Sequence, residues 1–121
     1  MSNYFLDTYA LIEIVKGNKN YQKFLDSEIF ISIFNLYEFH FSLLRDYNEQ
    51  TAKKFFNQFK NKVLKIKDEY IFGASKFKLQ NRKQKLSYAD CLGYMMALNN
   101  NMKFLTGDKE FENLKNVEFV K

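Results

Sequence analysis

The sequence predicts an α/β fold, a three-layer sandwich in which helices cover both faces of a mainly parallel sheet of about five strands. Short apolar runs of three or four residues alternate along the chain with longer segments whose apolar residues recur at helical spacing. Parallel strands need crossover connections, and such helices supply them. With 46% hydrophobic and 18% aromatic residues, the chain is rich enough in apolar side chains to fold as one domain over residues 1–121.

The first half of the chain predicts two strand and helix units. The run at 3–6 is short and apolar, and the apolar residues at 10, 11, 14 and 15 then recur at helical spacing up to Gly17, a typical C-terminal cap. A short helix at 21–25 precedes a buried strand at 29–31. Ser32 is a suitable N-cap for a long helix with one stripe formed by Phe34, Tyr37, Phe41 and Leu44.

The second half repeats the alternation. Phenylalanines at 55, 56 and 59 mark a helix, and the run Val-Leu-Lys-Ile at 63–66 predicts a strand. Asp68 opens a helix that continues to about Gln80, and Ser87 opens another that ends at the asparagines 99–101. A strand at 103–105, a short helix at 108–114 and a last strand at 117–120 complete the order.

Composition narrows the compartment and the partners. No apolar run approaches the roughly 18 residues of a membrane span, and the N-terminal residues lack the order of a signal peptide. The single cysteine, Cys91, fits a reducing compartment and is expected to be a small buried apolar residue. We therefore expect a cytoplasmic protein without a membrane segment. The formal charge of +5 permits a polyanionic partner.

Four acidic residues are expected at one edge of the sheet. Asp7 follows the first strand, Asp108 follows the strand ending near 105, Asp90 lies in the first turn of the helix from Ser87, and Glu38 lies about two turns into its helix. The carboxyl ends of parallel strands form the functional crevice of such sheets. Taken singly, each of the three aspartates is better explained as a helix cap than as part of a site, and its charge would also favour the helix dipole.

Glu38 is harder to explain in this way, because no Lys or Arg lies three or four residues from it. A fourth carboxylate at the same edge adds repulsion that a bound cation or protonation must offset. Carboxylates select hard ions, so Mg²⁺ or Mn²⁺ is expected, and the lack of a His or Cys cluster argues against zinc. The lone His40 lies on nearly the opposite face of the helix and is interpreted as structural.

Four segments carry a resemblance to a known family: "YFLDTYALIEIVKGN", "ISIFNLYEFHFSLLR", "LSYADCLGYMMALNNNMKFLTGDKEF" and "LKNVEFVK". In their order and spacing they resemble a PIN-domain protein, in particular the small ribonucleases of the VapC toxin type. The resemblance implies a PIN-like fold and metal-dependent hydrolysis of RNA, in which an ion-bound water attacks the phosphodiester. It also implies an antitoxin protein as partner and a homodimer. The implied metal-binding and catalytic residues are Asp7, Glu38, Asp90 and Asp108, with Thr106, Thr8 and Asn35 as supporting polar groups.

A basic segment leads into the helix that carries Asp90. Its residues Arg82, Lys83 and Lys85, together with Arg45, are the candidate contacts to RNA, although a solvated helix end explains the segment about as well. Without the four site acids, ten acidic residues remain against nineteen basic ones, which leaves about +9 on the rest of the chain. Phe77, within this segment, is expected to be a core residue.

The predicted function is a metal-dependent endoribonuclease that acts as the toxin of a toxin-antitoxin pair. The alternatives are a PIN nuclease that processes cellular RNA or acts on DNA, a noncatalytic RNA-binding or interaction module of the same fold, and, last, a phosphoryl-transfer protein. The phenylalanines at 55, 56 and 59 would suit a dimer or an antitoxin groove, and a fully buried core would explain them equally well.

Overall fold

The computed structural model describes residues 3–121 and contains one four-stranded sheet whose strands are all parallel, in the order β2-β1-β3-β4. Pairing is in register between Phe5 and Phe30, and Phe5 also pairs with Phe104 of the next strand. The α/β fold with a parallel sheet is therefore confirmed. The strands are β1 (Asn3–Leu6), β2 (Glu28–Phe30), β3 (Lys103–Thr106) and β4 (Val117–Phe119).

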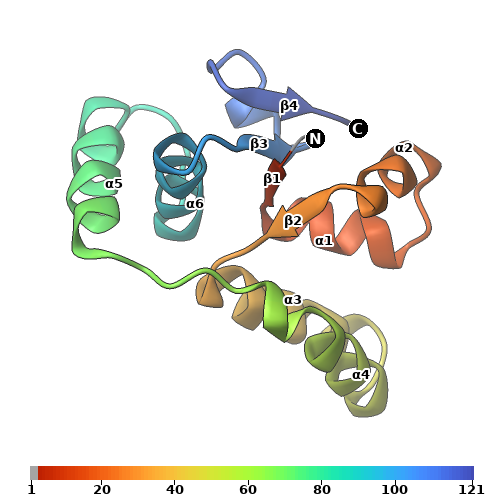
Figure 1. Cartoon of the computed structure of the whole chain (residues 1–121). Coiled ribbons are helices and arrows are strands. Elements are labelled where there is room, and N and C mark those ends of the chain that lie inside the picture. The colour runs from red at the N-terminus through yellow and green to blue at the C-terminus, as the bar shows by residue number, and fades with distance from the viewer. Residues whose placement is uncertain (1–2) are drawn as a thin grey trace.

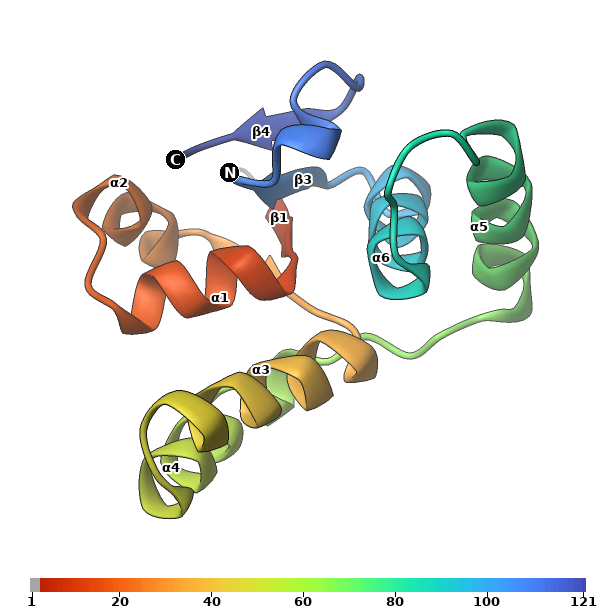
Figure 2. The same ribbon diagram turned by 180° about the vertical axis from the view of Figure 1, so that it is seen from behind.

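Helices lie on both sides of this sheet, as Figures 1 and 2 show from opposite directions. Two helices, α5 and α6, lie together on one side, and the other four lie on the opposite side or beyond the end of the sheet. Within residues 3–121 no helix is both long and apolar enough to cross a membrane. The helices are α1 (Thr8–Val15), α2 (Lys19–Gln22), α3 (Ile33–Asp46), α4 (Glu49–Phe59), α5 (Asp68–Gln80) and α6 (Tyr88–Asn99), with 3₁₀ turns at Lys23–Asp26, Lys60–Lys62 and Lys109–Phe111.

The strand expected at 63–66 is reduced to a single bridge between Val63 and Ile31. Two backbone hydrogen bonds, from Ile31 to Lys62 and from Leu64 to Ile31, complete the pairing. The segment cannot continue along the sheet because it crosses between layers: Val63 packs with the core under α1 and α3, whereas Leu64 packs with the core under α5 and α6. The sheet consequently has four strands where about five were expected.

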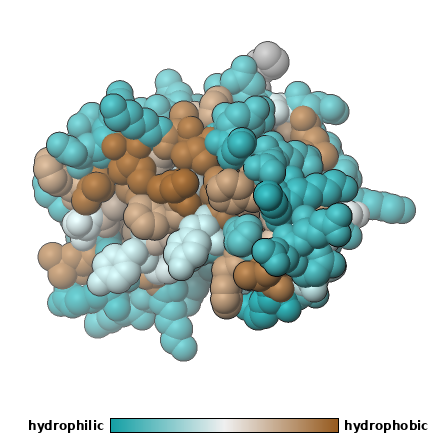
Figure 3. Space-filling view, turned by 90° about the horizontal axis from the view of Figure 1, so that it is seen from below, coloured by the Kyte–Doolittle hydropathy of each residue, from teal (hydrophilic) through white to brown (hydrophobic). Residues whose placement is uncertain are grey.

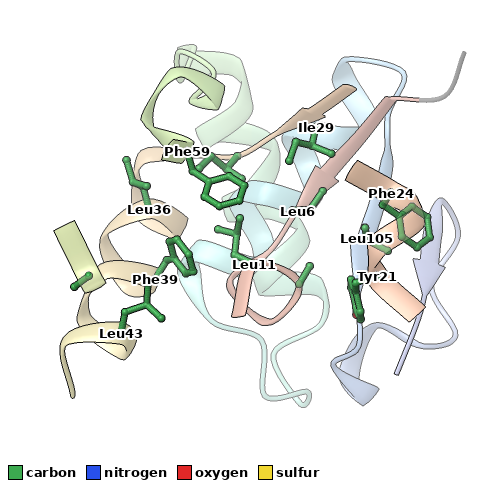
Figure 4. Packing of buried hydrophobic residues seen from close by; sticks show 13 residues of the cluster. Leu6, Leu11, Tyr21, Phe24, Ile29, Leu36, Phe39, Leu43, Phe59 and Leu105 are labelled. Carbon is green, nitrogen blue, oxygen red and sulfur yellow. The ribbon is translucent and has the colours of Figure 1, made fainter. Parts of the chain in front are cut away.

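Alternation along the strands fills both cores. Phe5 and Phe104 point to the α5 and α6 side, and the next residues, Leu6 and Leu105, point to the other side. Figure 4 shows this second core, where Leu11 lies beside the rings of Phe39 and Phe59, and Leu105 lies beside the rings of Tyr21 and Phe24. All four of these strand side chains are fully buried, which fixes the register of β1 against β3 and hence the position of the residues that follow them.

Two expectations about single residues, Cys91 and Phe77, are confirmed. Cys91 is buried, and Phe77 packs on Tyr94 with ring centroids 4.9 Å apart. Of the phenylalanines in α4, Phe59 is buried, while its two neighbours are half-buried against the same core. The helix expected at 108–114 is only the 3₁₀ turn at Lys109–Phe111, because the short connection from β3 to β4 must bring the ring of Phe111 onto Phe104.

Helix α3 differs from the sequence pattern in a way that matters for function. Its buried positions include Leu36, Phe39 and Leu43. The predicted stripe therefore faces solvent, since its four members are each between 44% and 72% exposed. Apolar residues on two faces of one helix indicate a second contact surface beyond the core. The stripe consists of Phe34, Tyr37, Phe41 and Leu44.

Candidate metal and nucleic-acid site

The four predicted acids line one pocket of about 610 Å³ at the carboxyl ends of the central strands. Asp7 directly follows β1, and Asp108 lies two residues after the end of the neighbouring strand β3. Asp90 comes from the first turn of α6, and Glu38 comes from the second turn of α3. Elements from four parts of the chain thus bring these carboxylates together. The full lining is Asp7, Thr8, Tyr9, Tyr37, Glu38, Phe41, Ser42, Ser87, Asp90 and Asp108.

Asp7 is the most buried of the acids, with only 2% of its surface exposed. Its Oδ1 accepts a hydrogen bond from the backbone N–H of Ala10 at 2.9 Å, and its Oδ2 accepts one from the Thr106 hydroxyl at 2.5 Å. Burial and, to a smaller extent, the charges of Asp90 and Asp108 together raise the pKa of Asp7 to about 7, although these two hydrogen bonds lower it. The carboxyl group is therefore poised to exchange a proton for a cation near neutral pH.

Thr106 connects two of the acids. Its Oγ1 donates to Asp7 and accepts a hydrogen bond from the backbone N–H of Asp108 at 3.0 Å. The resemblance assigned Thr106 to the last acid alone, and the geometry adds a direct contact to the first. One fully buried hydroxyl at the end of β3 therefore sets the orientation of Asp7 and the backbone position of Asp108.

Glu38 is held through a chain of polar side chains. The hydroxyl of Thr8 donates to Glu38 Oε1 at 2.6 Å, and the amide of Asn35 donates to Thr8 Oγ1 at 3.3 Å. Asn35 is itself fixed in a capping box with Ser32 at the start of α3. Thr8 and Asn35, which were predicted to be supporting groups, thus form a hydrogen-bonded chain from the start of α3 through the start of α1 to Glu38.

Asp90 is the third residue of α6, where Ser87 rather than Asp90 is the N-cap. The Asp90 backbone N–H donates to Ser87 Oγ at 3.0 Å. Burial raises the pKa of Asp90 to about 6; the hydrogen bonds with Ser87 lower it, and the charges of Asp108 and Glu38 raise it. These mutual effects show that the four carboxylates interact electrostatically.

Capping accounts for only part of this arrangement. Asp7 is the N-cap of α1, and Asp108 caps the following 3₁₀ turn by accepting from the Glu110 backbone N–H at 3.0 Å. Neither Asp90 nor Glu38 caps a helix. An aspartate can therefore be both a helix cap and a site residue, because a cap that follows a strand also places its carboxylate at the shared edge of the sheet.

The donor set fits a hard divalent cation in kind. Every candidate ligand is a carboxylate oxygen, the pocket lining contains no His or Cys, and like charges already oppose full ionisation. Among residues 3–121, however, no three Asp, Glu, His or Cys side chains lie close enough together to hold one ion as they stand. Metal binding would therefore require the carboxylates to move inward from their present hydrogen-bonded positions.

A family model of the PIN domain matches residues 4–117, which is most of the chain. The chain belongs to the PIN-domain family. Several solved structures that share its fold are described as VapBC proteins. Comparison with curated proteins gives no match of significance.

Three solved structures illustrate the similarity to this PIN domain. A toxin-antitoxin complex from Klebsiella pneumoniae is 18% identical, with 95% of each chain covered and a TM-score of 0.74. DNA-bound VapBC from Salmonella typhimurium is 15% identical, covers 99% of this chain and 98% of that one, and has a TM-score of 0.76. VapC20 from Mycobacterium tuberculosis, described as a sarcin-ricin loop cleaving toxin, is 11% identical over 90% and 91% of the two chains, with a TM-score of 0.73. At these identities the similarity establishes the fold.

None of the basic residues predicted to contact RNA belongs to the lining of the acidic pocket of the PIN domain. Arg82 lines a neighbouring apolar groove of about 520 Å³ between α5 and α6. Lys83 and Lys85 are exposed in the loop that joins these helices. Arg45 is paired with Asp46 at 2.8 Å, near the end of α3.

Sequence reasoning missed the three aromatic residues of the lining, Tyr9, Tyr37 and Phe41. The spacing of Tyr37 and Phe41 was interpreted only as an amphipathic stripe. The signal that could have found them is the second apolar face of α3, which the core does not use. His40 packs edge-on to Phe56, with ring centroids 5.8 Å apart, and lies outside the acidic pocket, in agreement with a structural role.

Proposed function

We propose that this PIN domain is a divalent-metal-dependent endoribonuclease that hydrolyses phosphodiester bonds of RNA. The observation that carries the proposal is the meeting of four carboxylates in one pocket of a protein whose net charge is +5. Such a pocket repels phosphate unless cations neutralise it, so a protein that only bound RNA would gain nothing from it. The description of VapC20 as a sarcin-ricin loop cleaving toxin agrees with this function.

The residues divide into ligands and positioning groups. Asp7, Glu38, Asp90 and Asp108 would hold Mg²⁺ or Mn²⁺, which when bound supplies a water of lowered pKa and stabilises charge on the phosphate. The Thr106 hydroxyl holds Asp7 and Asp108 in place, and Thr8 and Asn35 do the same for Glu38. The burial of Asp7 limits access of bulk water to that side of the site. In this proposal the chain contributes four oriented carboxylates and no covalent nucleophile.

The test compares the purified protein with its Asp7→Asn variant on labelled RNA, with Mn²⁺ or Mg²⁺ and then with a chelator. We expect wild type to cleave and the variant to be slower by at least about 100-fold, as for the loss of one charge-stabilising group. Glu112→Gln removes an exposed acid outside the pocket and should cleave like wild type. Equal cleavage by wild type and Asp7→Asn, or cleavage that survives chelation, would contradict the proposal. Absence of Mn²⁺ binding in calorimetry would refute the four-carboxylate site.

We further propose that the nuclease is the toxin of a toxin-antitoxin pair, that it acts in the cytoplasm and that it forms a homodimer. Support comes from the solved structures of this fold, which include complexes described as toxin-antitoxin and VapBC. The exposed apolar side chains of α3 and α5, such as Ile33 and Ile71, offer surface for protein contacts. Expression of wild type should arrest growth, and co-expression of a small protein encoded next to it should relieve the arrest. Growth unaffected by wild type that is an active nuclease in vitro would argue for RNA processing instead.

A further inference from the structure

A second basic segment of the chain lies away from the acidic pocket. Residues 53–67 contain six lysines and no acidic residue, so this one stretch carries six of the nineteen Lys and Arg residues of the chain. It comprises the later part of α4, the 3₁₀ turn that follows and the extended connection to α5. The lysine segment, as we call it, contributes Lys53, Lys54, Lys60, Lys62, Lys65 and Lys67.

The charges of the lysine segment are exposed and are not neutralised by acids. Five of its six lysines are exposed, and Lys62 is half-buried. Residues 3–121 contain two ion pairs, and neither of them involves this segment. Figure 3 views the molecule from the side of α3 and α4; hydrophilic residues cover the right-hand part, where α4 lies, and apolar residues gather on the left.

Local helix electrostatics explains only part of this charge. The negative end of the α4 dipole favours Lys60 and Lys62, which directly follow the helix. Lys65 lies in the extended connection, where no helix dipole acts, and Lys67 precedes the first residue of α5, where a positive charge is unfavourable. The second half of the segment therefore holds positive charge without a partner or a dipole that accounts for it.

The core holds the extended part of the segment in place. Leu64 and Ile66 pack with the core under α5 and α6, and the alternation of an extended chain then directs Lys65 and Lys67 to the opposite side, where both are exposed. Two such lysines are about 6.6 Å apart along the chain. The segment thus presents its charges in a fixed order along the surface and not on a loose loop.

Helix α3 separates the lysine segment from the acidic pocket. No residue of the segment lines that pocket. Helix α4 packs on the side of α3 that carries His40, nearly opposite to Glu38, since His40 lies edge-on to Phe56. Lys53 lines a groove of about 350 Å³ between α3 and α4, and Tyr37 belongs both to this groove and to the acidic pocket. A polymer that contacts the segment can therefore also reach the pocket.

The chemistry of the segment matches a phosphate backbone. Its three phenylalanines are buried or half-buried against the core, so within residues 53–67 no exposed ring is available to stack on a base. Lysines act as point charges, and contacts to phosphates position a nucleic acid without reading its sequence. An acidic protein would also be attracted, but protein interfaces are poor in lysine and have an apolar centre. The segment favours nucleic acid over a protein partner.

We propose that the lysine segment is an RNA-binding site separate from the acidic pocket, which holds the phosphate backbone of RNA without reading its bases. A paired stem presents such a backbone as well as a single strand does. The inference goes beyond the proposed nuclease function and rests on it only in taking RNA as the polyanion. The lysines are binding residues and take no part in hydrolysis.

The test measures RNA binding in the absence of cleavage. Fluorescence anisotropy with a labelled RNA hairpin of about 20 nucleotides, in chelator, gives Kd as a function of salt. Removal of three charges of the segment should raise Kd by at least about 10-fold at about 0.1 M salt and lower the slope of log K against log salt by about 2 to 3. Hairpins of unrelated sequence should respond alike. The triple variant carries Lys60→Gln, Lys65→Gln and Lys67→Gln.

The matched control removes three exposed lysines of other elements and has the same net charge as the segment variant. It should keep Kd within about threefold of wild type, because charges more than about 10 Å from the RNA are screened at this salt concentration. Circular dichroism should show intact folds for both variants, since all the substituted side chains are exposed. The control carries Lys19→Gln, Lys103→Gln and Lys115→Gln.

Three results would overturn the inference. Equal loss of affinity in the two triple variants would mean that net charge governs binding, and unchanged Kd in the segment variant would mean that the lysines do not contact RNA. Competition by polyglutamate as effective as that by RNA of equal charge would indicate a surface for acidic proteins.

Cleavage in Mn²⁺ tests the nuclease function separately from the lysine segment. Wild type that cleaves RNA while the segment variant binds the hairpin normally would overturn this inference alone. Wild type that cleaves no RNA while the segment variant loses binding would overturn the nuclease function and leave the RNA-binding site supported.

Discussion

At the scale of single residues, the site depends on hydroxyl groups as much as on carboxylates. The hydroxyl of Thr106 donates to the carboxylate of Asp7 and accepts from the backbone N–H of Asp108, and Thr106 has no exposed surface. Such outer contacts fix the direction in which a ligand oxygen points, and their loss typically weakens metal sites by about 10- to 100-fold. Removal of the Thr106 hydroxyl would thus disturb two of the proposed ligands at once.

Thr106→Val keeps the shape of the side chain and removes both hydrogen bonds. We expect Mn²⁺ affinity, measured by calorimetry, to fall by about 10- to 100-fold, with cleavage reduced in the same proportion at fixed metal. The free energy of unfolding should drop by about 1–3 kcal/mol, because the backbone N–H of Asp108 loses its partner. Thr106→Ser restores the hydroxyl and should recover most of the affinity. Loss in the valine variant that serine fails to recover would indicate a packing effect of the methyl group instead.

At the scale of elements, Asp90 is positioned by how closely α6 lies on the sheet. Gly93, one turn after Asp90, faces β1 and β3, and a Cβ at this position would lie 2.7 Å from Cε1 of Phe5 and 3.3 Å from Cε1 of Phe104. Both rings are fully buried and stacked, so they have little room to move. The glycine therefore lets the helix approach the strands whose ends carry the other two aspartates.

Gly93→Ala should consequently destabilise the protein in spite of the higher helix propensity of alanine. Overpacking of this kind costs roughly 1–3 kcal/mol, which urea unfolding would measure. Gly73→Ala is the matched control: its nearest contact is the side chain of Met95, 2.9 Å away, which has rotatable bonds to relieve the clash. Phe5→Leu should relieve part of the cost in the double variant. If Gly93→Ala were as stable as wild type, close packing of α6 would not be what fixes Asp90.

The ends of helices were predictable where a capping residue marks them in the sequence. The N-caps Ser32 and Ser87 and the C-terminal cap Gly17, which has a φ of 80°, mark real helix ends. The run at 63–66 failed because a strand pattern does not reveal that a chain is changing layers. The exposed stripe of α3 was equally hidden, since helical spacing shows that a face is apolar and does not show what it contacts.

At the scale of the whole molecule, the meeting of the acids was predictable because the order of the parallel strands brings distant residues to one edge of the sheet. A parallel sheet with β1 beside β3 brings the residues after both strands to one edge, so Asp7 and Asp108 could be paired from the sequence alone. Glu38 and Asp90 followed from helix positions together with the resemblance to the PIN family. The contact between Thr106 and Asp7 joins residues 99 apart in the chain, and no spacing rule reaches that far.

The buried carboxylates of the pocket make the stability of the metal-free protein depend on pH. Burial raises the pKa of Asp7 to about 7 and that of Asp90 to about 6, from an ordinary value of 3.8. Between about pH 4 and pH 7 the folded state therefore holds more protons than the unfolded state, and the free energy of unfolding falls as pH rises. The cost of ionising Asp7 is at most about 4 kcal/mol, at 1.36 kcal/mol per pH unit. A divalent ion that binds the ionised carboxylates works against this loss.

Asp7→Asn separates the two effects. With chelator present, wild type should lose stability between about pH 4 and pH 7 in urea unfolding, and Asp7→Asn should lose less because the amide does not ionise. At about pH 8, Mn²⁺ at 100 times its Kd should stabilise wild type by about 2.7 kcal/mol and Asp7→Asn by much less. Glu112→Gln, which alters an exposed acid outside the pocket, should follow wild type in both respects. Parallel pH profiles for wild type and Asp7→Asn would show that Asp7 ionises as easily in the folded protein as in the unfolded chain. Ionisation of Asp7 would then cost the folded protein nothing that a bound metal ion could offset.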